Sequence, residues 1–166
     1  MNWLIFKAFI KVVIRLDCSF IFIDESSFSS WALKTRTWEK KGKQAIVVRP
    51  YEMKSVAMMG ALLSDGTLVS VLRQGTNSRN ETVDFLLKLE LFLKEKHGKN
   101  YRSFWNRLIV VMDNASIHKT KEVKNFFTKR AIQCVTLPQY TPECNPIERV
   151  FALLKRSVSS CNLSNW

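Results

Sequence analysis

Short apolar runs separated by polar segments mark the first half of the 166-residue chain. The first is Cys18 to Ile23, and an unbroken apolar run of this length predicts a strand. Two more, Ser55 to Leu63 and Thr67 to Leu72, are joined by Ser64-Asp65-Gly66. An Asp-Gly pair between β-rich runs is typical of a hairpin, so we expect these two runs to pair.

Helical periodicity begins after the hairpin. Ser78 and Glu81 have the spacing of a capping box, and the helix that they open should close at His97-Gly98. Its apolar residues recur at helical spacing: Phe85, Leu86, Leu89, Phe92 and Leu93. Leu108 to Met112 is then a continuous apolar run, which predicts a strand covered on both faces.

Three further elements complete the pattern. A helix is expected from Thr120 to Arg130, with Val123, Phe126 and Phe127 directed inward. Ile132 to Leu137 predicts a last strand. A final helix should begin at Pro146, because proline is favoured at the first helical position and Asn145 can act as its N-cap. The expected apolar face of this helix comprises Ile147, Val150, Phe151, Leu154 and Val158. This order of strands and helices indicates an α/β domain.

The N-terminal segment differs from the rest. It is apolar, but Lys7, Lys11 and Arg15 interrupt it every four residues, which breaks any membrane span or secretory signal. We interpret residues 1–17 as an amphipathic helix or a fragment boundary, and residues 18–166 as one domain. We therefore expect no membrane among the partners of this protein.

Charge and cysteine content indicate the class of binding partner and the cellular compartment. The chain has 26 Lys and Arg against 14 Asp and Glu, a formal net charge of +12. Such a surplus suits a phosphate backbone or an anionic membrane, and a solvated basic surface with no specific partner is the alternative. Four cysteines form no Cys-x-x-Cys pair, and we expect Cys18 and Cys134 to be buried free thiols in a reducing, intracellular compartment.

Three carboxylates stand at the ends or beginnings of predicted elements. Asp24 follows one apolar run, Asp113 follows another, and Glu148 lies in the first turn of the last helix. If the two runs are parallel neighbours, their carboxyl ends place Asp24 and Asp113 side by side. Carboxylate oxygens are the ligands that hard divalent cations prefer, and a metal site in a basic protein would face a polyanion.

Each acid also has a simpler interpretation. Glu148 could be the acidic residue of a helix cap, Asp113 a turn residue after a strand, and Asp24 ordinary surface charge. These interpretations do not predict that all three occur together within recognisable motifs.

The motifs around the acids carry a resemblance. Phe22-Ile-Asp-Glu-Ser-Ser-Phe28, Val110-Val-Met-Asp-Asn-Ala-Ser-Ile-His118 and Leu137-Pro-Gln-Tyr-Thr-Pro-Glu-Cys-Asn-Pro-Ile-Glu-Arg149 resemble the catalytic core of mariner-superfamily DDE transposases and their bacterial insertion-sequence relatives. Residues 114–147, 34 in all, separate the second acid from the third. The resemblance extends from about Phe20 to Val158.

The resemblance implies a ribonuclease H-like fold, with a mixed five-stranded sheet flanked by helices. It implies that Asp24, Asp113 and Glu148 are catalytic ligands of two Mg²⁺ ions, which Mn²⁺ can replace, and that Asp24 bridges the two. The implied reaction is DNA cleavage that leaves a 3′-OH, followed by strand transfer, with transposon ends and target DNA as partners and TA as a target site. The resemblance also allows a homodimer. It implies that the protein acts in the nucleus of a eukaryote, or in the cytoplasm of any other cell.

Several basic residues are candidates for DNA contact. A basic stretch from Glu25 to Lys43 contains Trp31 and Trp38, and basic and aromatic groups together suit unpaired bases. The candidate DNA-binding residues are Lys41, Lys43, His118, Lys119, Arg149, Lys155 and Arg156. A solvated lysine-rich face, a Trp38 packing anchor and a backbone-bonded His118 are the alternatives.

Two other functions stay open at this point. One is a domesticated, non-catalytic DNA-binding or assembly module, and the other is a structure-specific nuclease on the same fold. Transposases of this kind normally carry an N-terminal helix-turn-helix portion, and residues 1–17 are too few for it. Recognition of specific ends is therefore expected to need a module that these residues do not contain.

Overall fold

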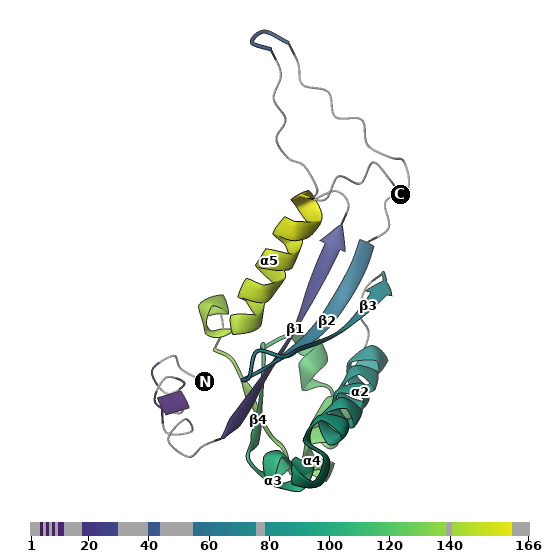
Figure 1. Ribbon diagram of the computed structural model, residues 1–166, viewed down its shortest axis with the longest axis vertical. Helices are drawn as coiled ribbons and strands as arrows, with labels where there is room; N and C mark the ends of the chain where they lie inside the picture. Colours follow the sequence, from purple (N-terminus) through teal and green to yellow (C-terminus); the bar gives the residue numbers. More distant parts are fainter. Residues whose placement is uncertain are drawn as a thin grey trace.

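The computed structural model describes residues 4, 6, 8, 10, 11, 18–29, 40–43, 55–75, 79–138 and 141–160. A five-stranded sheet forms its centre, with the strand order β3-β2-β1-β4-β5 (Figure 1). The strands are β1 (Ser19–Ser29), β2 (Ser55–Leu63), β3 (Leu68–Gln74), β4 (Leu108–Met112) and β5 (Gln133–Thr136). β1, β2 and β3 pair antiparallel, whereas β4 lies parallel to both β1 and β5. The predicted mixed five-stranded sheet is confirmed.

Helices cover both faces of the sheet (Figure 1). α2 (Arg79–His97) and α4 (Lys121–Lys129) pack on one face, together with the short helix α3 (Tyr101–Asn106). α5 (Pro146–Ser160) packs on the other face, across β1 and β2. Within the described residues, 3₁₀ helices join these elements: η2 (Gly98–Asn100), η3 (Ser116–Lys119) and η4 (Pro142–Cys144).

Alternate residues of the strands build two cores, because successive side chains of a strand point to opposite faces. Ile21 and Ile23 of β1 are fully buried against the side of α2 and α4. Phe22, between them, packs instead with Ile147 and Phe151 of α5. All five residues of β4 are buried, which confirms a strand covered on both faces.

The β2–β3 hairpin turns through three residues, Ser64, Asp65 and Gly66. Leu63 N donates to Thr67 O at 2.9 Å, and Gly66, with φ +87°, has the left-handed conformation of the last loop residue in this hairpin class. Asp65 accepts a hydrogen bond from Thr67 N at 2.9 Å and pairs with Lys96 at 3.0 Å, so the turn is also joined to α2.

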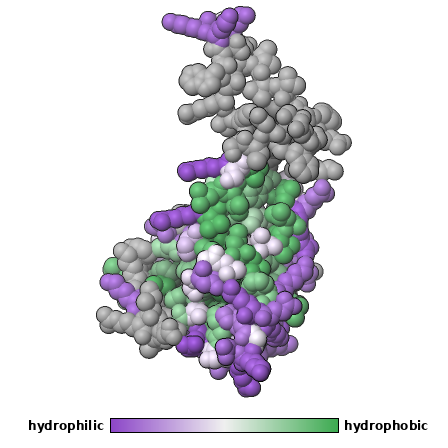
Figure 2. Space-filling model, in the orientation of Figure 1, coloured by the Kyte–Doolittle hydropathy of each residue, from purple (hydrophilic) through white to green (hydrophobic). Residues whose placement is uncertain are grey.

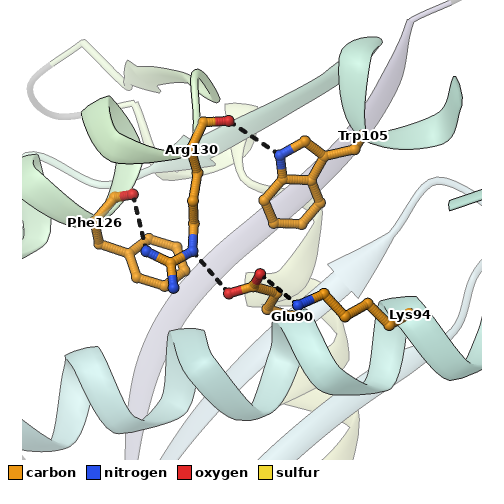
Figure 3. Close-up of polar contacts among 5 residues, drawn as sticks. All are labelled: Glu90, Lys94, Trp105, Phe126 and Arg130. Carbon is orange, nitrogen blue, oxygen red and sulfur yellow. Dashed lines mark hydrogen bonds and ion pairs between the residues drawn. The ribbon is translucent and has the colours of Figure 1, made fainter. Parts of the chain in front are cut away.

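A polar cluster connects α2, α3 and α4 on the face of the sheet that these helices cover (Figure 3). Arg130 Nε donates to Glu90 at 2.7 Å, its guanidinium lies 3.9 Å from the centre of the Phe126 ring, and its carbonyl accepts from Trp105 Nε1 at 3.1 Å. Lys94 approaches Glu90 at 2.9 Å. Burial alone would raise the pKa of Glu90, but the hydrogen bonds from Lys94 and Arg130 outweigh it and lower that pKa.

Some expectations need correction. β1 continues to Ser29, so Asp24 lies inside a strand and not at its end. Cys134 is exposed on the edge strand β5, and Cys18 is only partly buried. Val158 is 39% exposed and therefore does not belong to the buried face of α5. The short helices between α2 and β4 have no counterpart in the predicted elements.

Other expectations are confirmed or lie outside the described residues. α2 ends at His97, before Gly98 with φ +47°, and Thr120 caps α4 by accepting from Val123 N. Ser78, Trp31, Trp38 and Cys161 lie outside the described residues. The described N-terminal residues are helical, and Phe6 is buried beside Phe20. No helix within the described residues is long and apolar enough to span a bilayer.

The face of the sheet that carries α5 also bears exposed apolar side chains. Leu153 of α5 is 61% exposed and Leu72 of β3 is 62% exposed. Figure 2 shows an apolar surface over α5 and the neighbouring strands, bordered by hydrophilic side chains.

Candidate active site

Asp24 and Asp113 meet where the parallel pairing of β1 and β4 stops. The last parallel partners are Ile23 and Met112, and each aspartate is the next residue of its chain segment. β1 continues beyond this point paired only with β2, whereas β4 ends. The two aspartates are thus neighbours at the carboxyl end of the parallel pair, as the sequence predicts.

Asp24 is a buried carboxylate with both oxygens engaged. The residue is 7% exposed. Its Oδ1 accepts from the backbone N–H of Glu25 at 2.7 Å, and its Oδ2 accepts from Asn145 Nδ2 at 2.8 Å. The pKa of Asp24 is raised to about 7, chiefly by burial and also by the negative charges of Glu148, Asp113 and Glu25, against the lowering effect of the hydrogen bond from the Glu25 N–H.

Glu148 reaches this region because α5 packs closely on β2. Gly60 lies opposite Asp24 in the β1–β2 pairing. A Cβ atom on Gly60 would stand 3.1 Å from the Phe151 ring and 3.2 Å from Ile147, so the absence of a side chain lets the first turns of α5 approach the strand. Glu148, next to Ile147 in that first turn, is exposed.

Asp113 belongs to a second group of polar residues, with His118 and Glu25. Asp113 Oδ1 accepts from the backbone N–H of Ala115 at 3.0 Å and lies 3.2 Å from His118 Nδ1. His118 Nε2 lies 3.6 Å from Glu25 Oε1. The imidazole side chain is only 3% exposed, and burial lowers the pKa of His118 although Asp113 raises it.

Asn145 precedes α5 as expected, but its side chain does not act as the helix cap. Its amide nitrogen donates to Asp24, and its Oδ1 is buried without a hydrogen-bond donor among the described residues. The backbone oxygen of Asn145 accepts from Glu148 N at 3.1 Å. The predicted N-cap is therefore wrong in its hydrogen bonding, because a partner 121 residues away in the chain takes the amide.

The donor set of this region suits a hard cation. It offers carboxylate oxygens from Asp24, Asp113 and Glu148 and the buried amide oxygen of Asn145, to which no residue of the described part of the chain donates. Within the described residues, no three acidic, histidine or cysteine side chains converge into a closed metal site. The charges of Asp113 and Glu148 nonetheless act on Asp24, so the acids share one region.

The candidate DNA-binding residues differ in their exposure. Six are exposed: Lys41, Lys43, Lys119, Arg149, Lys155 and Arg156. Lys155 Nζ lies 5.8 Å from the centre of the Phe28 ring of β1, on the side of α5. His118 differs, since it is buried between two carboxylates.

A family model described as "DDE superfamily endonuclease" matches residues 19–165, which is most of the chain. The chain belongs to the DDE superfamily endonucleases. Among curated relatives of this DDE domain, the Tcb2 transposase of Caenorhabditis briggsae is 23% identical over 156 residues, covering 87% of the chain and 54% of the relative. The Tc3 transposase of Caenorhabditis elegans is 29% identical over 93 residues, covering 54% of the chain and 26% of the relative. The DDE domain described here thus spans about half the length of the first of these relatives.

Solved structures share the fold of this DDE domain. A pre-cleavage Mos1 transpososome aligns with TM-score 0.73 and 16% identity, covering 92% of the chain and 46% of the Mos1 chain. The Mos1 catalytic domain with raltegravir and Mg aligns with TM-score 0.64 and 17% identity, covering 88% and 64%. These alignments confirm the ribonuclease H-like fold that the resemblance implies.

Three contributors to the site escaped the sequence analysis. The sequence analysis gave no role to Glu25 or Gly60, and it assigned Asn145 to a helix cap. A glycine within an otherwise apolar strand is the only local signal among them, because it often marks a close approach of another element.

Proposed function

We propose that this domain is the catalytic core of a transposase, which cleaves DNA to leave a 3′-OH and then joins that end to target DNA. Asp24, Asp113 and Glu148 are its catalytic residues and metal ligands. The observation that carries the proposal is the meeting of Asp24 and Asp113 at the end of the β1–β4 pair, with α5 bringing Glu148 to act on the same buried carboxylate.

The chemistry follows from the donor set. Two Mg²⁺ ions, or Mn²⁺ in their place, would supply activation of the attacking oxygen and stabilisation of the leaving oxygen. The three acids would hold these ions, and burial of Asp24 keeps its oxygens away from bulk water. In cleavage, water forms a new P–O bond as the bond to the 3′ oxygen breaks. In strand transfer, that 3′-OH attacks a target phosphodiester, so the number of phosphodiester bonds is unchanged.

The exposed basic residues would hold the DNA. Lys119 follows His118 in η3, while Arg149, Lys155 and Arg156 lie along α5 beyond Glu148. Cations on these elements would bind phosphates beside the acids, and Lys41 and Lys43 would bind DNA farther along the chain. The burial of His118 favours a role in positioning Asp113 over direct contact with a phosphate.

The partners in this proposal are transposon ends and target DNA. Similar structures include a Mos1 paired-end complex with Mn and a Mos1 strand transfer complex, which supports a homodimer here. Recognition of specific ends would be the task of a helix-turn-helix module. The site of action would be wherever the element's DNA resides, the nucleus in a eukaryote.

A nicking assay tests the proposal. The 166-residue chain is incubated with supercoiled plasmid carrying inverted repeats, with Mn²⁺ or Mg²⁺ or with EDTA. We expect nicks only with the cation, loss of at least about 100-fold in rate for Asp113→Asn and Glu148→Gln, and unchanged DNA binding. Glu143→Gln, an exposed acid five residues before Glu148, is the matched control and should retain activity. DNA binding without any nicking in the unaltered chain would instead indicate a non-catalytic module.

A further inference from the structure

Asn145 is a buried residue beside the Asp24 carboxylate. It is 3% exposed and stands immediately before α5, three residues from Glu148. Its amide nitrogen is held by Asp24 Oδ2 at 2.8 Å. Because both polar atoms of an amide are bonded to one carbon, Oδ1 must lie in the same small region as the Asp24 carboxylate.

The amide oxygen has an unmet requirement. Oδ1 is buried and accepts no hydrogen bond from any residue that the structure describes. Leaving a buried acceptor without a donor destabilises a folded protein, and native structures contain few such groups. The usual helix-cap contact, in which this oxygen accepts a backbone N–H of the first turn, is not made, although α5 begins at the next residue.

A divalent cation, with its bound waters, meets this requirement. A neutral amide oxygen is an ordinary ligand of hard cations and adds no charge to a region that already holds Asp24, Asp113 and Glu148. The amide nitrogen meanwhile neutralises part of the charge on Asp24 and fixes the direction of that carboxylate. We propose that Asn145 is a further member of the cation site, with Nδ2 orienting Asp24 and Oδ1 serving as an oxygen donor to the cation or to a water bound to it.

This inference rests on the proposed function, and the experiment separates the two. Mn²⁺ binding is measured by isothermal titration calorimetry and by loss of the free Mn²⁺ signal in electron paramagnetic resonance, with no DNA present. Asn145→Ala should weaken Mn²⁺ binding roughly 10- to 100-fold, the range found for groups that orient metal ligands. Asn145→Asp, which retains an oxygen at this position, should bind Mn²⁺ at least as tightly as Asn145.

Controls keep the result interpretable. Asn100→Ala changes an exposed asparagine in η2 and should bind Mn²⁺ as the unaltered chain does. Thermal unfolding in EDTA shows whether each variant is folded, and if Asn145→Ala is not, the comparison of Asn145→Asp with the unaltered chain decides. Weaker binding by Asn145→Asp would show that only the amide donor matters and would overturn the role of Oδ1.

Two further outcomes distinguish an error in the inference about Asn145 from an error in the proposed function. If Asn145→Ala is folded and binds Mn²⁺ as tightly as the unaltered chain, the inference is wrong while the proposed function stands. If the unaltered chain binds no Mn²⁺ at all, both the inference and the proposed function are wrong.

Discussion

Gly60 lies directly beneath Phe151, and a Cβ atom at that position would come within 3.1 Å of two carbons of the aromatic ring. The contact places β2 against α5 at the point in the sheet where Gly60 pairs with Asp24. It therefore links the packing of a helix to the geometry of the candidate active site.

Gly60→Ala should push α5 away from the sheet. Phe151 and Ile147 are both fully buried, so the added methyl group has little room, and overpacking of this kind costs about 1–3 kcal/mol. We expect a lower free energy of unfolding in urea and weaker Mn²⁺ binding, since Glu148 moves with the helix. Adding Phe151→Leu to Gly60→Ala should recover part of both losses. If the losses in the double variant equal the sum of the losses in the two single variants, the contact is unimportant.

Ala131 offers a change that should stabilise the fold. It has φ +52°, a conformation that favours glycine, at the end of α4. Ala131 N donates to Thr128 O and Ile132 N donates to Phe127 O, the hydrogen bonds of a Schellman motif. Ala131→Gly should raise the free energy of unfolding by about 0.5–1 kcal/mol, and Ala131→Val should lower it. Chemical denaturation measures both, and a loss of stability in the glycine variant contradicts the assigned backbone strain.

Glu90 should be more important for stability than the surface ion pairs. It is partly buried and receives Arg130 at 2.7 Å and Lys94 at 2.9 Å (Figure 3). Glu90→Ala leaves the Arg130 guanidinium without its carboxylate, and we expect a loss of about 1–3 kcal/mol in urea denaturation. Lys96→Ala, which removes a pair with the half-exposed Asp65, should cost less than about 1 kcal/mol. Equal costs for the two variants would contradict this ranking.

Asp24 should make the metal-free protein less stable at high pH. Its pKa is about 7 in the folded state and 3.8 ordinarily, so the folded state binds the proton more tightly. This contribution to stability is complete below about pH 4 and is lost as pH rises through 7, by at most roughly 4 kcal/mol. His118 acts in the opposite sense, because its lowered pKa costs stability as pH falls below 6.5.

Comparison with Asp24→Asn isolates this effect. In EDTA, the free energies of unfolding of the two proteins should diverge in favour of the variant between about pH 4 and pH 7 and differ by a constant amount above that range. Mn²⁺ at pH 8 should then raise the melting temperature of the unaltered chain and leave that of the variant nearly unchanged. Parallel pH curves for the two proteins would show that Asp24 is not the group responsible.

The strands and their order along the chain could be predicted because their signals are local. Most strand residues other than the end of β1 lie within or beside apolar runs, and the Asp-Gly pair marks the hairpin. The continuation of β1 could not be predicted, since Glu25-Ser-Ser carries no apolar pattern and pairs with β2 alone. That pairing is a property of the assembled sheet.

The candidate site was predictable to the same extent. The ends of two apolar runs and the start of a helix singled out Asp24, Asp113 and Glu148 as candidates from nearby residues. The environment of these acids depends on contacts distant in sequence: Asn145 with Asp24, and His118 with Glu25. Local patterns assign an asparagine before a helix to its cap, and only the folded chain shows that Asp24 takes its amide instead.

Anomalous X-ray scattering from crystals of the chain equilibrated with Mn²⁺ tests the central claim most directly. We predict Mn²⁺ peaks between the carboxylates of Asp24, Asp113 and Glu148, with Asp24 contacting each ion that is bound. The assignment of this region as the catalytic site would be contradicted by Mn²⁺ peaks only at other positions. It would also be contradicted if no Mn²⁺ peak lay among these three side chains at saturating Mn²⁺.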